Sequence, residues 1–237
     1  MTVNHGVIGS SPIRDAFLII NNKFVNFIDT NYWLVMVKLL KHKIKKQSFL
    51  IQIMELNNAI KSRHSVRKFK EKKPDWRDII ECIDFARYAP MAGNNFTLKF
   101  IIVDEKEKIE NIANACQQKF VGEAKYIVVV CSNSSRLVNA YGEKGEKFNK
   151  QQVGAAIENF LLKIEEKKLA TCWVGYFAEE QIKQILKISE NTEIEALFPI
   201  GYELEKSYVK REKADIDSIL YFNEFKKKRM KEPHHVD

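Results

Sequence analysis

The chain has 237 residues, of which 45% are hydrophobic and 11% aromatic, and its formal net charge is +8 at pH 7. This length and composition predict a globular protein with one sizeable core and argue against a disordered or fibrous chain. Lys and Glu are interspersed, and the conspicuous basic runs at 41–46 and 226–229 are short, so the charge alone does not predict nucleic-acid binding.

Residues 1–53 differ from the rest of the chain, because apolar and Asn/Lys-rich pieces alternate there without a clear period. Met54 then opens the sequence MELNNAIKSRHSVRKF, which reads like a natural protein start. We therefore expect a functional domain at 54–237 and, before it, an extension that is either a mis-assigned start or an added arm. No run approaches the roughly 20 apolar residues of a membrane span.

The chain after Met54 begins with alternating helix and strand signals. Asp75 is suited to cap a helix that runs to about residue 88 and ends before Pro90. The residues expected on its inner side are Ile79, Ile80, Ile83 and Ala86. The other elements expected here are helices at 55–62 and 105–116 and strands at 98–103 and 126–131. The last of these reads YIVVVC, and this continuous apolar character predicts burial on both faces.

The stretch from Gln152 to Gly175 has the clearest pattern. One apolar stripe of a helix of about five turns is formed by Val153, Ala156, Ile157, Phe160, Leu161 and Ile164. Ala155 and Leu162 lie off this stripe, so we expect the helix between layers or at a subunit contact. The apolar run at 170–174 predicts a buried strand, and Gly175 predicts a close approach of backbone to another group.

The last elements are a helix at 179–188, a strand at 195–202 and a helical segment from about Asp215. The order of elements favours an α+β or a three-layer α/β arrangement, in which helices cover both faces of the sheet. Four widely spaced cysteines have neither CxxC spacing nor neighbouring histidines: Cys82, Cys116, Cys131 and Cys172. This spacing predicts reduced, buried thiols in a cytoplasmic protein rather than a metal site or a disulfide framework.

Few residues carry obvious chemistry. Arg63, Ser65 and Arg67 place two guanidiniums and a hydroxyl within five residues, which suits a phosphate group, although a basic surface turn is the common alternative. The loop APMAGNN at 89–95 offers amides and Asn side chains to a polar ligand, or is a tight turn. A polar triplet at 117–119 and a second basic cluster at 210–213 complete the candidates.

Four blocks of sequence, in this order and spacing, resemble the nitroreductase family of flavin-dependent oxidoreductases. They are AIKSRHSVRKF at 59–69, YAPMAGNNFTLKFIIV at 88–103, VGAAIENFLLKIEEKKLATCWVG at 153–175 and ALFPIGYELEK at 196–206. The resemblance implies a three-layer α+β fold with a central mixed or antiparallel sheet flanked by helices. It also implies a homodimer formed through a long helix, with FMN at each of two interface sites.

The same resemblance implies roles for individual residues. The set expected to hold the FMN phosphate is Arg63, His64, Ser65 and Arg67. The set expected to reach the flavin from the partner subunit is Pro90, Met91, Ala92 and Asn94. The ring's polar edge would bond Gln118, with Gln117, and its face would meet Val174 and Gly175, whose backbone would hydrogen-bond near N5. The cation expected to return to the phosphate is one of Lys210, Arg211 and Lys213.

The sequence also departs from the family. Met91 replaces a common Ser, and Phe96, Thr97 and Leu98 replace a Gln-Pro-Trp-like triplet, which alters the expected contacts beside the ring. The resemblance implies a ping-pong reaction in which NADH or NADPH reduces FMN, and FMN then reduces a nitroaromatic, quinone-like or related electrophilic acceptor.

No catalytic side chain is implied, and we expect Cys172 and Trp173 to serve as core packing. The alternatives are another reduction or an oxygen-dependent reaction on this fold, or a basic, non-enzymatic binding protein.

Overall fold

A computed structural model describes residues 56–205 and 212–230 of the chain. The expected extension at 1–53 lies outside these residues. The chain divides into two units, Met1–Asn58 and Ala59–Asp237, and the site described below lies within the second.

Four strands in the described part of the chain form one sheet of order β1-β2-β4-β3. They are β1 (Leu98–Val103), β2 (Tyr126–Ser132), β3 (Ala170–Thr171) and β4 (Glu193–Gly201). Every neighbouring pair is antiparallel, so of the two expected kinds of sheet the antiparallel one is present. The two central strands, β2 and β4, shift register once, between Val130 and Cys131.

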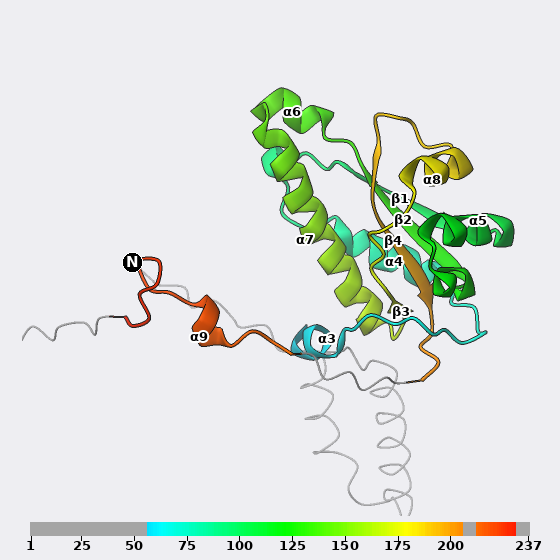
Figure 1. Cartoon of the computed structure of the whole chain (residues 1–237), viewed down its shortest axis with the longest axis horizontal. Helices are drawn as coiled ribbons and strands as arrows, with labels where there is room; N and C mark the ends of the chain where they lie inside the picture. Colours follow the sequence, from blue (N-terminus) through cyan, green and yellow to red (C-terminus); the bar gives the residue numbers. More distant parts are fainter. Residues whose placement is uncertain (1–55, 206–211, 231–237) are drawn as a thin grey trace, which may run out of the picture. The chain divides into compact units, whose positions relative to one another are not determined.

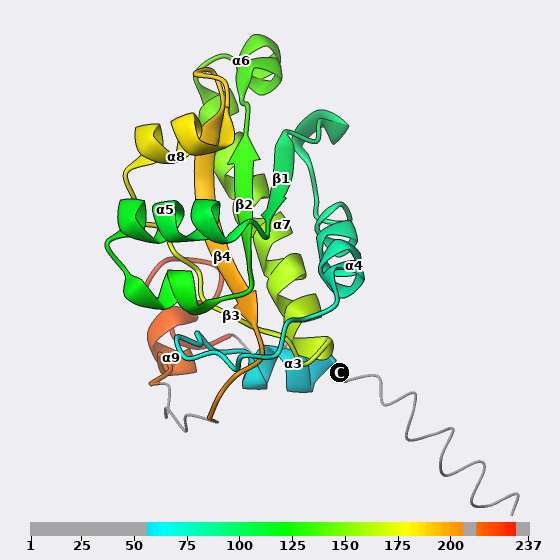
Figure 2. The same cartoon turned by 90° about the vertical axis from the view of Figure 1, so that its right-hand side faces the viewer.

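Helices cover both faces of this sheet, as Figures 1 and 2 show. The helices that the structure describes are α3 (Leu56–Ser62), α4 (Trp76–Ala86), α5 (Lys106–Cys116), α6 (Ser135–Tyr141), α7 (Lys144–Glu166), α8 (Glu179–Leu186) and α9 (Ile216–Ile219). Two short 3-10 turns are η1 (Ala92–Asn94) and η2 (Lys119–Glu123). The predicted cap is confirmed, since the Asp75 side chain accepts a hydrogen bond from the Arg77 N–H. In the described segments, no helix combines the length and apolar character of a membrane span.

The central strand β2 explains the three layers. All seven of its residues are buried, which confirms the prediction from its apolar sequence. Because side chains alternate along a strand, Val128 and Val130 enter a core shared with α4 and α7, whereas Ile127 and Val129 enter a second core shared with α5 and α8. The sheet therefore separates two cores, and the fold is α+β.

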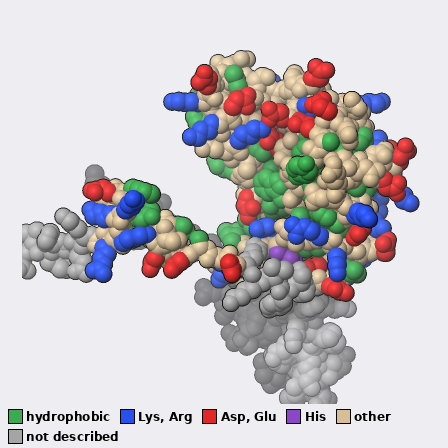
Figure 3. All heavy atoms as spheres, in the orientation of Figure 1, with side chains coloured by type: hydrophobic (Ala, Val, Ile, Leu, Met, Phe, Trp, Pro, Cys, Tyr) green, Lys and Arg blue, Asp and Glu red, His purple; other side chains and the backbone are tan. Residues whose placement is uncertain are grey.

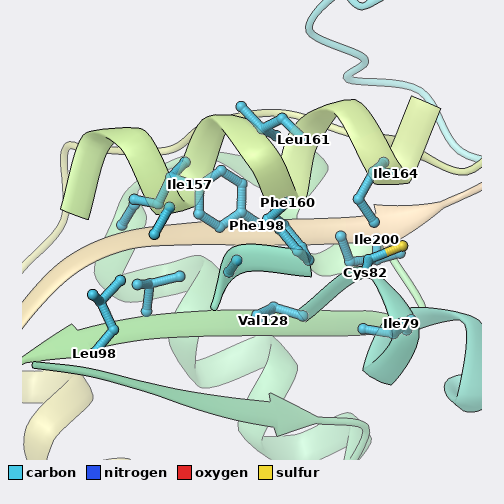
Figure 4. Packing of buried hydrophobic residues seen from close by; sticks show 14 of the residues in the cluster. Ile79, Cys82, Leu98, Val128, Ile157, Phe160, Leu161, Ile164, Phe198 and Ile200 are labelled. Carbon is cyan, nitrogen blue, oxygen red and sulfur yellow. The ribbon is translucent and has the colours of Figure 1, made fainter. Parts of the chain in front are cut away.

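The α7 stripe predicted from the sequence is fully buried in the first core. Phe160 lies at its centre, where its ring meets Phe198 of β4 edge to face at 5.4 Å between ring centroids (Figure 4). Ala155 and Leu162 are half-buried. The helix thus has a second, partly apolar side beyond the stripe that packs on the sheet.

Two expectations about element boundaries were wrong, and one helix was not expected. α7 begins at Lys144, eight residues before Gln152, and follows α6, which was not expected. The added turns pack on α6 at Gly145, where a Cβ would lie 2.4 Å from the Leu137 carbonyl carbon, so only glycine fits there. The strand expected at 170–174 has regular pairing only at Ala170–Thr171.

Ile80 is 46% exposed rather than on the inner side of α4. The buried residues of α4 are Ile79, Cys82 and Ala86, which are spaced i, i+3 and i+7. Ile80 follows Ile79 by one residue, about 100° further around the helix, and so falls outside this stripe.

Candidate functional site

The segment 63–70 contains the predicted phosphate-binding residues and is anchored to the sheet by main-chain bonds. The Val66 N–H donates to the Thr171 carbonyl at 2.9 Å, and the Lys70 N–H donates to the Tyr202 carbonyl at 2.8 Å. Val66 and Phe69 are buried in a small third core with residues of the η2 corner and β3. The backbone of this segment is therefore held at two points, one on either side of Arg67.

The polar side chains next to these anchors reach solvent. Ser65 and Arg67 are exposed, and they flank the buried Val66. The Arg67 guanidinium lies 5.9 Å from the centroid of the Phe120 ring. Arg63 has a looser contact, since its Nε is 3.7 Å from Glu158 Oε1 of α7. Two guanidiniums and a hydroxyl are thus presented from one fixed segment.

His64 makes different contacts from its neighbours. Its Nδ1 lies 2.9 Å from the Ser62 carbonyl oxygen, and its Nε2 lies 2.8 Å from Glu203 Oε1, beyond the end of β4. Burial opposes the charged imidazole, but the hydrogen bonds to Glu203 and Ser62 outweigh it and raise the pKa of His64. The ring is therefore engaged with protein groups on both nitrogens.

Gly201, at the end of β4, is required by close packing against this segment. A Cβ at Gly201 would lie 2.7 Å from Cδ1 of Phe69, closer than real Cβ contacts allow. The glycine thus lets the Phe69 ring lie directly on the β4 backbone. This contact packs the segment 63–70 against the sheet.

Gln117 and Gln118 lie at the corner between α5 and η2. Gln117 closes α5 in the left-handed conformation, with φ 55°, and is exposed, whereas Gln118 is half-buried. Phe120, which contacts Arg67, follows two residues after Gln118. The structure thereby brings the predicted glutamines to the same region as the segment 63–70.

Val174 and Gly175 follow β3 at the edge of the sheet. The N–H and the carbonyl of Val174 are both hydrogen-bonded to the backbone of Leu197 in β4, each at 3.0 Å, so both groups already have partners within the sheet. Gly175 is the next residue and is exposed. Cys172 is buried, as expected, and Trp173 packs edge to face on Phe198 but remains 44% exposed, so packing accounts for only part of its surface.

The loop 89–95 is held by Gln152 of α7, a residue for which the sequence pattern predicted no role. Gln152 is 4% exposed. Its Oε1 accepts from the Ala92 N–H at 3.1 Å, and its Nε2 donates to the Asn95 carbonyl at 3.1 Å and to Thr97 Oγ1 at 2.7 Å. One side chain therefore joins both ends of the turn, within which Gly93 and Asn94 both have φ 55°.

A buried chain of hydrogen bonds continues from Thr97. Its hydroxyl donates to Asn149 Oδ1 at 2.7 Å, Asn149 Nδ2 donates to Ser132 Oγ at 2.8 Å, and Ser132 donates to Glu195. The signal for this network was present in the sequence, because Asn149 and Gln152 continue the apolar stripe of α7 toward its N-terminus. Polar residues at core positions of a helix require buried partners.

The predicted site residues fall into two groups at opposite ends of the sheet. The loop 89–95 lies near the Glu193 end of β4 and the segment 63–70 near its Gly201 end. β4 has nine residues, so at about 3.3 Å per residue these ends are roughly 25 Å apart. The corner at Gln118 lies with the segment 63–70, whereas Gly175 follows Val174, which is bonded to Leu197 at the middle of β4. Within one chain, the residues of the loop, Pro90, Met91, Ala92 and Asn94, therefore do not meet the segment 63–70.

The expected basic residues of the tail are only partly described. Lys213 is exposed, and Lys210 and Arg211 lie outside the described residues. On the face shown in Figure 3, Lys and Arg side chains are interspersed with Asp and Glu side chains. This distribution agrees with the mixed charge pattern of the sequence.

Comparison with known proteins identifies the family. The model of the nitroreductase family matches residues 60–121 and 114–202, which together span more than half of the chain. The chain belongs to the nitroreductase family.

Among curated relatives, a protein of Methanothermobacter thermautotrophicus with the provisional name NADH dehydrogenase/NAD(P)H nitroreductase is 28% identical over 157 residues, covering 64% of this chain and 79% of its own. Iodotyrosine deiodinase of Thermotoga neapolitana is 23% identical over 175 residues, covering 62% of this chain and 88% of its own.

Solved structures share the fold. A nitroreductase family protein from Clostridium novyi NT has a TM-score of 0.59 and 28% identity, covering 74% of this chain and 97% of its own. An FMN-dependent nitroreductase from Clostridium difficile R20291 has a TM-score of 0.60 and 22% identity, covering 70% of this chain and 98% of its own. These structures confirm the predicted nitroreductase-like α+β fold.

Proposed function

We propose that this chain is an FMN-dependent NAD(P)H oxidoreductase, a flavoprotein of the nitroreductase type. The observation that carries this proposal is the anchored segment 63–70, from which Arg63, Ser65 and Arg67 present charged and hydroxyl donors. Guanidinium groups bind phosphate through paired, charge-assisted hydrogen bonds. FMN-dependent activity among proteins of the same fold, and the NAD(P)H named for a relative, support the same cofactors.

The neighbouring residues fit the rest of this cofactor. Gln118, with Gln117, offers amide groups to the polar edge of the flavin ring. Gly175 has no side chain, and a Cβ placed there would meet nothing closer than Trp173 Nε1 at 3.9 Å. A flat ring can therefore approach this backbone, and because the backbone groups of Val174 are bonded to β4, we assign the N5 contact to the Gly175 N–H. A cation from Lys210, Arg211 or Lys213 would complete the phosphate site.

FMN, when bound, supplies the hydride chemistry, taking a hydride from NADH or NADPH and passing it to an electron-poor acceptor in a ping-pong cycle. The residues of the chain bind and orient the cofactor: Arg63, His64, Ser65 and Arg67 act at the phosphate end, and the glutamines and Gly175 act at the ring. We assign no side chain a catalytic proton transfer. The proposed acceptors are nitroaromatic, quinone-like or related electrophilic molecules.

The separation of the two groups of residues supports a homodimer with FMN at the interface. The loop that contains Pro90, Met91, Ala92 and Asn94 and the segment 63–70 lie near opposite ends of β4, a strand roughly 25 Å long. The loop of a partner subunit would supply what one chain cannot, and the second, partly apolar side of α7 is a surface on which two chains could associate. Mass from light scattering tests this arrangement, since a flavin-loaded monomer would contradict it.

Two further proposals concern the cellular location of the protein and its division into domains. The four cysteines are free and buried, which supports a cytoplasmic location, because secreted chains usually pair such thiols. We also propose that the functional domain spans 54–237 and is preceded by an extension at 1–53. A shortened chain that begins at Met54 should bind FMN as tightly as the full chain if this division is correct.

The experiment that tests the proposed function is steady-state turnover of the FMN-loaded protein with NADH and with NADPH. The acceptors are a nitroaromatic, a quinone and 3-iodo-L-tyrosine, the last because of the similarity to iodotyrosine deiodinase. Parallel double-reciprocal plots with the nitroaromatic or the quinone are expected. Turnover of 3-iodo-L-tyrosine alone would replace the proposed acceptors by a dehalogenation substrate, and no turnover with any acceptor would refute the proposal.

A further inference from the structure

We propose that His64 is a positioning residue whose imidazolium ties the phosphate-binding segment to Glu203, and that FMN binding weakens when His64 loses its proton. This inference rests on the proposed function. It assigns His64 a role different from that of Arg63 and Ser65, because it acts on the phosphate through the segment that carries them.

The contacts of the ring require both nitrogens to carry a proton. Nδ1 lies 2.9 Å from the carbonyl oxygen of Ser62, and Nε2 lies 2.8 Å from a carboxylate oxygen of Glu203. Both partners are hydrogen-bond acceptors, and a neutral imidazole has only one N–H. Only the imidazolium donates to both oxygens, so loss of its proton leaves one nitrogen lone pair facing an oxygen.

The charged groups around the ring favour the same state. Glu203 and, at longer range, Glu165 of α7 raise the pKa of His64 against the opposing effect of burial. The side chains of His64 and Glu203 are 26% and 18% exposed, so solvent screens their attraction only in part. Arg63 is the adjacent cation, and its Nε lies near Glu158, which partly offsets its charge.

The backbone around Glu203, the hydrogen-bond partner of His64, is itself held in place. Residue Glu203 forms an isolated antiparallel bridge with Phe69, and the Leu204 N–H donates to the Lys68 carbonyl at 3.0 Å. The main chain beyond β4 is thereby paired with the far end of the segment, while the His64 side chain holds its near end. Arg63 and Ser65 are the sequence neighbours of His64, so the hydrogen bond between His64 and Glu203 restricts the movement of both phosphate donors.

The sign of the pH dependence follows from the raised pKa of His64. The hydrogen bonds from the imidazolium to Glu203 and Ser62 are complete below the ordinary pKa of 6.5. They are lost as pH rises through the higher pKa that His64 has in the folded protein. A phosphate monoester has its second pKa near 6, so FMN is almost fully dianionic above about pH 7. Any weakening of FMN binding between pH 7 and pH 9 therefore does not come from the phosphate itself.

The test measures dissociation constants of FMN and of riboflavin, which lacks the phosphate, from pH 6 to pH 9. For the wild-type chain, FMN should bind on the order of 3- to 10-fold more weakly at pH 9 than at pH 7, the size of one partly screened charge-assisted hydrogen bond. Riboflavin binding should stay constant over this range. His64→Gln and Glu203→Gln should each bind FMN at pH 7 as the wild-type chain does at pH 9, without the pH dependence.

Several results would overturn the inference. They are a flat FMN profile for the wild-type chain, an unchanged slope in His64→Gln, or an equal slope for riboflavin. An NMR titration of His64 in the flavin-free protein gives an independent readout, and a pKa below 6.5 would also refute it. If the wild-type chain binds no flavin at any pH, the proposed function fails together with this inference, whereas tight but pH-independent FMN binding removes the inference alone.

Discussion

The substitution Arg63→Ala tests the proposed phosphate site most sharply. Arg63 presents a guanidinium from the anchored segment 63–70, and its nearest acidic partner is Glu158, 3.7 Å from its Nε. Removing the guanidinium takes away the proposed charge-assisted contact to the phosphate. It leaves the sheet, Gln117 and Gln118, and Gly175 in place. FMN binding should weaken, and riboflavin binding should remain as it is in the wild-type chain.

The magnitude follows from two opposing terms. A hydrogen bond to a charged group contributes about 1.5–3 kcal/mol, which is roughly 10- to 100-fold in Kd. The Glu158 side chain is half exposed, so its pair with Arg63 contributes at most about 1 kcal/mol, and binding of a phosphate would disturb it. The net loss expected for Arg63→Ala is therefore about tenfold or more.

The assay is fluorescence titration of FMN and riboflavin at low ionic strength, with Glu158→Gln as the matched control. Because Glu158 competes with the phosphate for Arg63, this control should bind FMN as tightly as the wild-type chain or slightly more tightly. An FMN dissociation constant within twofold of wild type for Arg63→Ala would refute the assignment. An equal loss for riboflavin would show that the substitution acts on the fold.

Three other predictions concern the structure that supports the site. Phe160→Ala should lower the free energy of unfolding by about 3–5 kcal/mol in urea, because the ring is fully buried, whereas Phe225→Ala, whose ring is 79% exposed, should cost clearly less; equal losses would contradict the assignment of the core. Gln152→Leu should cost about 1–3 kcal/mol by removing the side-chain partner of the Ala92 N–H and the Asn95 carbonyl, whereas the exposed neighbour Gln151→Leu should be nearly neutral, and a neutral Gln152→Leu would refute the role of Gln152 in holding this turn. Burial raises the pKa of three of the four cysteines to about 11 or 12, so a thiol reagent at pH 8 should label the native protein far more slowly than the unfolded protein, and rapid native labelling would contradict the packing.

The elements with a strong period were predicted well from the sequence. The strand expected at 98–103 is β1, with the same bounds, and each residue of the α7 stripe is buried. In both cases the apolar spacing reflects the surface that packs on the sheet, so the pattern and the burial have one cause. The segment predicted to bind phosphate was also placed correctly at the end of a helix, because α3 ends at Ser62.

Features that depend on tertiary contacts were not predicted. The first turns of α7 lack an apolar stripe and are held by the contact of Gly145 with the α6 backbone. Gln152 and Asn149 gain their roles from Thr97 and Ser132, which are distant in sequence. The separation of the loop 89–95 from the segment 63–70 follows from the antiparallel register of the strands, which no local pattern specifies.

The central claim, that this chain uses FMN to accept electrons from a nicotinamide nucleotide, is tested most directly by visible absorption. The purified chain is incubated with FMN, freed of excess cofactor and then treated with NADH or NADPH in the absence of oxygen. We predict retained flavin bands that bleach with at least one nucleotide and return when a nitroaromatic or a quinone is added. A chain that retains no flavin, or whose flavin does not bleach with either nucleotide, would contradict the claim.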